Sequence, residues 1–266
     1  MPRFWTFSDL HQEWPDNGWD PALHAPHSGF DAVLAAGDVA SPLTSALDWL
    51  HDRVPGSRVL YTPGNHDFWC DPNGDDRYTY DDQVARGRDR AARYGIDLLL
   101  DDTVVVDGVR VIGSTLWTDL HLSPFPLTCT ARNAEKRMRD YRRIRRRLTG
   151  HHKYITARDT LSWHRAARNY VIDALGHTFD GPTLVMTHHA PSAWSLNADA
   201  SDLPFCYASA LDDLVAGSGA ATWVHGHIHG RADYRLGDTR VRCNAMGHIE
   251  QVEARTAFDP SLVLTL

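Results

Sequence analysis

The sequence has few cysteines, no long hydrophobic run and no excess of positive charge. Its four cysteines are scattered without a C-x-x-C pair, so we expect free thiols in a reducing compartment rather than a disulfide framework. No apolar stretch approaches the roughly 18 residues that span a membrane, and the first residues form no signal pattern. The net charge of −7 argues against a protein built mainly to coat nucleic acid. These absences predict a soluble, cytoplasmic protein that does not contact a membrane.

What remains is a chain with enough apolar residues for a sizeable core. Its 266 residues are 42% hydrophobic, close to the globular norm. Short apolar runs that read as buried strands alternate with segments of helical periodicity, which favours an α/β fold. We predict one domain over residues 1–266. The predicted strands that matter most for function cover residues 3–8, 32–35, 58–61, 183–186 and 222–225.

Each of these five strands is followed directly by polar groups that can bind a metal. The third strand ends at Thr62-Pro63-Gly64-Asn65-His66-Asp67, which presents an amide oxygen, an imidazole and a carboxylate in consecutive positions. Loops at the carboxyl ends of strands are where α/β proteins usually display such groups to a ligand. The predicted metal ligands from all five strand ends are Asp9, His11, Asp38, Asn65, His188, His227 and His229.

The chemistry of these side chains indicates a centre of two metal ions. Imidazole and carboxylate ligands without a thiolate suit Mn, Fe, Zn or Co. Seven ligands are too many for one tetrahedral ion, but they suit two divalent or trivalent ions that share a carboxylate. Such a pair favours in-line attack on phosphorus. It would deprotonate a bridging water near neutral pH and stabilise charge on the phosphoryl oxygens.

The order of the motifs resembles that of the calcineurin-like metallophosphoesterase superfamily. The resemblance implies a four-layer α-β-β-α sandwich of two mixed sheets, with the metals at the carboxyl ends of the strands. The matching motifs span most of the chain and read Asp9-x-His11, Gly37-Asp38, Gly64-Asn65-His66-Asp67, Thr187-His188-His189 and Gly226-His227-x-His229.

The resemblance also implies a role for each residue. Asp38 would bridge the two ions, and His66 would be the catalytic acid that protonates the leaving oxygen or steadies the phosphoryl group. One ion would be held by Asp9, His11, Asp38 and His229. The other would be held by Asp38, Asn65, His188 and His227.

One motif departs from the Ser/Thr protein phosphatase branch. That branch reads G-D-x-V-D-R-G, whereas this chain has Gly37-Asp38-Val39-Ala40-Ser41-Pro42. The aspartate that orients the catalytic histidine in that branch is therefore missing, and Asp67 is an open candidate for its replacement. We expect a bacterial-type enzyme outside the protein phosphatase branch.

A basic segment separates the third motif from the fourth. Residues 131–147 carry nine Arg or Lys, and Met138, Tyr141, Ile144 and Leu148 fall on one helical stripe. We predict a basic helix there and a second helix over residues 157–175, which together form a helical insertion over about 119–175. Three residues of the basic helix and one residue beside a ligand are candidate substrate contacts, with a solvated or packed side chain as the alternative: Tyr141, Arg142, Arg143 and His189.

The sequence thus predicts a metal-dependent phosphoric ester hydrolase that acts on a phosphodiester or a phosphomonoester. A small phosphate ester is the expected partner. One alternative is a nuclease whose Arg-rich helix holds nucleic acid. Binding of that nucleic acid would weaken steeply as the salt concentration rises. Another is a metal-binding interaction scaffold without catalysis.

Overall fold

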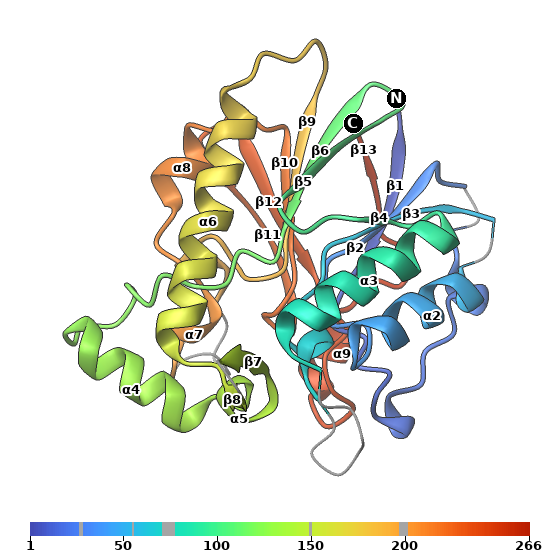
Figure 1. The fold of residues 1–266 in the computed structure, drawn as a ribbon. Coiled ribbons are helices and arrows are strands. Elements are labelled where there is room, and N and C mark those ends of the chain that lie inside the picture. The colour runs from blue at the N-terminus through green and yellow to red at the C-terminus, as the bar shows by residue number, and fades with distance from the viewer. Residues whose placement is uncertain (27–28, 55, 71–77, 149–150, 197–201) are drawn as a thin grey trace.

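The computed structural model describes residues 1–26, 29–54, 56–70, 78–148, 151–196 and 202–266, and two β-sheets form its centre (Figure 1). The first sheet has the strand order β13-β1-β2-β3-β4, with bounds β13 Val263–Thr265, β1 Arg3–Phe7, β2 Ala32–Ala35, β3 Arg58–Tyr61 and β4 Asp97–Leu98. The second has the order β11-β12-β10-β9-β6-β5, with bounds β11 Arg231–Leu236, β12 Thr239–Asn244, β10 Thr222–His225, β9 Thr183–Thr187, β6 Val109–Ser114 and β5 Asp102–Val106.

Both sheets are mixed, as predicted. Strands β1 to β4 run parallel, and β13 is antiparallel to β1. In the second sheet β6, β9, β10 and β12 run parallel, while β5 and β11 are antiparallel edge strands. The parallel strands are nearly continuous in apolar residues because both of their faces are buried.

Helices cover the outer face of each sheet and complete four layers. Helices α2 (Leu43–Arg53) and α3 (Tyr80–Tyr94) lie beside the first sheet, and α6 (Ala157–Gly176) and α8 (Asp212–Ala216) lie beside the second (Figure 1). Between the sheets, fully buried side chains from both form one apolar layer, which includes Phe4, Leu34, Leu60, Val111 and Met186. The predicted four-layer sandwich is therefore confirmed.

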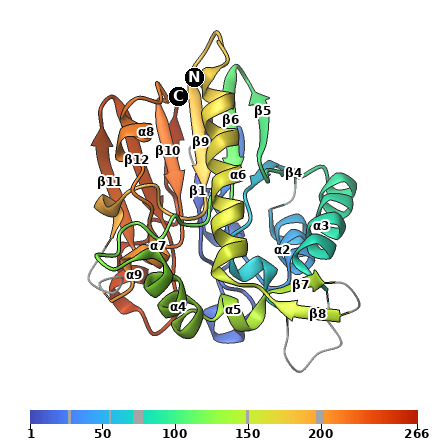
Figure 2. The ribbon, with the colours of Figure 1, turned by 60° about the vertical axis from the view of Figure 1, so that its left-hand side comes forward.

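The remaining elements are short and lie mostly around one end of the sheets. They are η1 Pro15–Asn17, α1 Pro21–His24, η2 His66–Phe68, α4 Leu127–Arg137, α5 Asp140–Arg143, β7 Arg145–Leu148, β8 His151–Tyr154, η3 Ala193–Ser195, α7 Pro204–Tyr207 and α9 Val252–Ala257. Strand β1 runs from the N-terminus toward this end, where α4, α5 and the β7–β8 hairpin lie together (Figures 1 and 2). None of the helices in the described part of the chain is long and apolar enough to cross a membrane.

The prediction of one basic helix over residues 131–147 is wrong. Helix α4 ends at Arg137, and the backbone of Met138 is extended. After the four-residue α5, strand β7 pairs with β8 as an antiparallel hairpin. The hairpin satisfies backbone groups that a helix would have satisfied internally, and Asp159 and Asp82 pair with two of its arginines. We call residues 127–156, which contain α4, α5 and this hairpin, the insertion arm.

Close packing between the two sheets generates the first testable prediction. A Cβ added at Gly113 in β6 would lie 2.3 Å from Cβ of Leu99, which follows β4 in the other sheet. Gly113→Ala should therefore lower the free energy of unfolding by about 1–3 kcal/mol, measured by urea denaturation. Gly176→Ala is the matched control, because nothing lies within 4 Å of a Cβ added there. Equal midpoints for the two variants would contradict the argument.

Candidate metal centre

All seven predicted ligands and His66 gather where the parallel strands of both sheets end. Among the described residues, three groups could hold a metal ion, and within each group the possible ligand atoms lie within 4.8 Å of one another. Asp38 belongs to two of these groups, one with His11 and His66 and the other with His188 and His227. A single carboxylate thus faces imidazoles that come from opposite sheets.

The first cluster contains two imidazoles whose nitrogens face each other. Nε2 of His11 lies 3.1 Å from Nε2 of His229, and Asp9 Oδ1 lies 3.5 Å from the latter. The Nδ1 atoms of the two rings face oxygens of Glu13 and Gln251. If each Nδ1–H donates to its oxygen, the lone pairs of both Nε2 atoms face each other at short range and repel. A cation between the two nitrogens would remove that repulsion.

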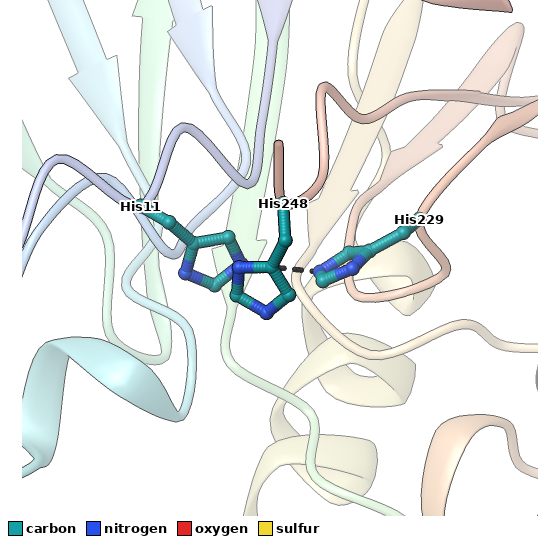
Figure 3. Close-up of side chains that lie close together, drawn as sticks. All are labelled: His11, His229 and His248. Carbon is teal, nitrogen blue, oxygen red and sulfur yellow. Dashed lines mark hydrogen bonds between the residues drawn. The ribbon is translucent and has the colours of Figure 1, made fainter. Parts of the chain in front are cut away.

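His248 joins this cluster from the segment between β12 and α9, and the sequence analysis missed it. Its ring stacks on that of His11 at a centroid distance of 4.3 Å, and it lies 4.8 Å from the ring of His229. Figure 3 shows the three rings side by side, with the dashed contact between His11 and His229 passing behind His248. Its position shortly after the end of β12, a sixth strand end, was the signal that could have identified it, but no sequence motif marks it. His248 offers the cluster a further nitrogen that could bind a metal ion.

The second cluster shows the same convergence of lone pairs around Asp38. Nδ1 of His188 lies 2.8 Å from the carbonyl oxygen of Ala36 and donates to it. Its Nε2 faces Asn65 Oδ1 at 3.0 Å and Asp38 Oδ2 at 3.4 Å. The amide nitrogen of Asn65 donates instead to Asp140. Three possible ligand atoms therefore converge, and all are oxygens or nitrogens of the kind that bind Mn, Fe or Zn.

The protonation states suit metal binding, which requires deprotonated ligands. Burial alone would raise the pKa of Asp38, but the charge of His188 holds it well below its usual range. Burial lowers the pKa of His11 to about 4 and that of His227 well below its usual range. Burial also opposes charge on His188, but the carboxylates of Asp38 and Asp9 raise its pKa to about 9. A metal cation would take the place of this proton.

The backbone is shaped around these groups. Asp9, His11, Asp38 and His227 all have φ between 47° and 65°, a left-handed conformation that costs energy for non-glycine residues and that clusters at functional sites. Gly64 leaves room for the ligands, because a Cβ there would lie 2.1 Å from Asp38 Oδ1.

Asp67 does not orient His66. Its buried carboxyl group accepts the backbone N–H groups of Asp38, Ala40 and Gly64, so it fixes the loops that carry two predicted ligands. The group that faces His66 is Glu13, whose Oε1 lies 3.0 Å from His66 Nδ1. The sequence analysis missed Glu13, although its place two residues after His11 was an available signal.

Both the backbone and the ring of His66 are fixed at the edge of the centre. The backbone N–H of His66 donates to Asp38 Oδ1 at 2.8 Å, and the imidazole ring stacks on Trp69 at a centroid distance of 3.5 Å. Trp14 packs edge-on against it. The ring therefore has a defined orientation beside the shared carboxylate.

A cavity of about 590 Å³ opens beside both clusters. Its walls include the predicted residues Asp38, Asn65, His66, His227 and His229, the aromatic residues Trp14, Trp69 and Tyr207, and from the insertion arm Arg137, Met138, Arg139 and Asp140. The four candidate substrate contacts are not among the residues described as lining it. Tyr141 is packed in the apolar clusters with its hydroxyl 3.1 Å from that of Thr160.

The other three candidate contacts have other surroundings. Arg143 lies over the ring of Trp69 at 5.7 Å, and Arg142 is exposed. His189 is buried, with Nδ1 facing the carbonyl oxygen of Thr115 at 3.1 Å and its ring 4.2 Å from that of His227. The arginines that reach the cavity are Arg137 and Arg139 instead.

Comparison with known proteins identifies the family to which this architecture belongs. A family model described as calcineurin-like phosphoesterase matches residues 2–231. No curated protein matches the sequence. The fold is similar to that of the phosphopantetheinyl hydrolase of Mycobacterium tuberculosis, with a TM-score of 0.73, 17% identity, and coverage of 97% of this chain and 94% of that one.

A putative 5′-nucleotidase of Staphylococcus aureus is 14% identical, with a TM-score of 0.44, and the match covers 91% of this chain and 48% of that one. The family match covers most of the chain and includes every predicted ligand. The chain belongs to the calcineurin-like phosphoesterase family and is a metal-dependent phosphoester hydrolase.

Proposed function

We propose that the protein hydrolyses phosphodiesters with two metal ions bridged by Asp38. The observation that carries this proposal is the place of Asp38 in two separate ligand groups. On one side it faces His11, and on the other it faces His188 and His227. A carboxylate has two oxygens and can serve one ion with each. The two groups then form the clamp that an in-line displacement at phosphorus requires.

Each half of the centre takes ligands from both sheets. Asp9, His11, Asp38 and His229 would hold one ion, and Asp38, Asn65, His188 and His227 the other. When bound, the two ions supply a deprotonated water and stabilise charge on the phosphoryl oxygens. Because Asp9 and Asp38 follow the first sheet while His188 and His229 follow the second, the centre depends on the contact between the sheets.

His66 is the residue that we assign as general acid. Burial lowers the pKa of His66, and the charges of Asp38 and Asp140 oppose this shift. Glu13 faces Nδ1 at 3.0 Å and accepts from it. In the imidazolium, Nε2–H is then the donor available to the leaving oxygen. The pair Glu13–His66 takes the role that an Asp–His pair would have in the branch from which this sequence departs.

The cavity walls favour a diester with an extended group. Arg137 and Arg139 of the insertion arm line the cavity together with Trp14 and His248. Arginine binds phosphate through paired N–H groups, and the aromatic rings suit an organic substituent. A phosphopantetheinyl ester is one suitable test compound, given the fold shared with the hydrolase of that name.

The nuclease alternative has less support from the arm. Arg146 and Arg147 form ion pairs with Asp159 and Asp82 at 2.7 Å, so part of its positive charge is used within the chain. A non-catalytic scaffold has no need for the oriented His66 and Glu13 beside the ligands. We therefore favour a small-molecule diesterase.

The shared carboxylate predicts the metal content. Asp38→Ala should contain fewer than two ions per chain, because both ions lose a ligand, and chelation of the wild-type protein should abolish hydrolysis reversibly. Metal analysis after dialysis against Mn²⁺ measures this. Asp213→Ala, an exposed carboxylate in α8, is the control and should keep the wild-type content. Two ions in Asp38→Ala would refute the bridge.

The acid role predicts a separation of metal binding from turnover. His66→Ala should keep both ions and lose roughly 10²–10⁴-fold in kcat on a model diester such as bis(p-nitrophenyl) phosphate. Glu13→Gln removes a carboxylate 3.0 Å from Nδ1 of His66, so the basic limb of its pH–rate profile should move to lower pH. Activity of His66→Ala close to that of the wild type would remove this residue from the mechanism.

The cavity predicts which arginine contacts substrate. Arg139→Ala should raise KM for an anionic diester about tenfold, because a charge-assisted hydrogen bond is lost, with kcat little changed. Arg142→Ala is the control, since this exposed arginine is three residues away and outside the described cavity wall. An equal effect of both variants, or single-stranded DNA binding that weakens steeply with salt, would favour the nuclease instead.

A further inference from the structure

A buried carboxylate of the insertion arm contacts the metal centre through Asn65. Asp140, the first residue of α5, is 5% exposed. Its Oδ1 accepts hydrogen bonds from Asn65 Nδ2 at 2.8 Å and from Trp69 Nε1 at 2.7 Å. Asp140 and Asn65 are 75 positions apart in the sequence. The arm therefore reaches a predicted metal ligand directly.

This contact decides which end of the Asn65 amide faces the ligands. Because Nδ2 donates to Asp140, Oδ1 is presented to His188 Nε2 at 3.0 Å. The terminal torsion of an asparagine is broad and roughly two-fold, so a flipped amide is the competing state. In that state Nδ2 would donate to the lone pairs of His188 and Asp38. The centre would then satisfy its own acceptors and exclude a cation.

The same oxygen also fixes a neighbour of the proposed acid. The ring of Trp69, held by its N–H to Asp140, stacks on the ring of His66. One carboxyl oxygen of Asp140 therefore holds both the amide of Asn65 and the indole beside His66.

We propose that Asp140 is a positioning residue that commits Asn65 to metal binding, so that the insertion arm controls occupancy of the ion held by Asp38, Asn65, His188 and His227. This inference rests on the proposed two-ion centre. It adds a residue that touches neither the ion nor the substrate and acts through Asn65.

The experiment compares two variants of similar size by titrating the metal-free protein with Mn²⁺ and measuring free Mn²⁺ by electron paramagnetic resonance. Asp140→Leu removes the acceptor, and its affinity for one of the two ions should fall roughly 10–100-fold while the other is retained. Asp140→Asn keeps an amide oxygen that can accept both hydrogen bonds, and its affinity should stay near that of the wild type. Circular dichroism and urea unfolding verify that both variants are folded at the titration temperature.

A double-mutant cycle separates positioning from general loosening of the structure. In the Asn65→Ala background, Asp140→Leu should cause no further loss of Mn²⁺ affinity, because the side chain through which it acts is gone. Trp69→Phe removes only the second hydrogen bond of Asp140 and should keep the affinity. It distinguishes action through Asn65 from action through Trp69.

The outcomes separate this inference from the proposed function. Wild-type Mn²⁺ affinity in folded Asp140→Leu, or full additivity with Asn65→Ala, would overturn the role of Asp140 and leave the two-ion centre intact. A wild-type protein that binds fewer than two ions per chain would overturn the centre itself, and the inference with it. If one of the two ions is lost in Asp140→Leu and retained in Asp140→Asn, the inference is supported: the amide of Asn65 is held by its acceptor.

Discussion

The candidate metal centre depends on ring nitrogens and oxygens that face one another at hydrogen-bond distance. Nδ1 of His188 is bound to a backbone carbonyl, and the Nδ1 atoms of His11 and His229 face side-chain oxygens. Each Nε2 is therefore directed at another acceptor, within 3.0–3.1 Å. Buried acceptors opposed in this way are unfavourable unless a positive charge lies among them. The surrounding hydrogen bonds thus create a demand for cations, and the two sheets supply the rigidity that maintains it.

The fold and the convergence of the candidate ligands could be predicted because they depend on local sequence. Apolar runs of four or five residues marked the parallel strands, and a polar group directly after each run had to lie at one edge of a sheet. Asn65 and Asp38 needed no further information than this. The family motifs then assigned these groups to two ions. The geometry of Asp38, which lies in both groups, agrees with that assignment.

The supporting residues could not be predicted in the same way, because their partners lie far away in the sequence. Asp140 is 75 positions from Asn65, and Glu13 is 53 positions from His66. The prediction of one helix for the basic segment was wrong for a related reason. Its spacing fits a helix, but a partner strand and the carboxylates of Asp159 and Asp82 favour a hairpin. Periodicity records which side chains can be buried together, not which backbone will satisfy the hydrogen bonds.

The insertion arm has a consequence for how metal and substrate are linked. Arg137 and Arg139 line the cavity, and Asp140 follows directly and holds Asn65. Because these residues are adjacent, the arm cannot move away from the sheets without displacing both the arginines and the acceptor of the amide. Substrate that binds the arginines would stabilise the arm in place, and the arm in place favours the ion. Linkage requires the converse, so an ion bound beside Asn65 would favour the arm position in which the arginines face the cavity. With the roles proposed above, the insertion arm would make metal binding and substrate binding mutually reinforcing.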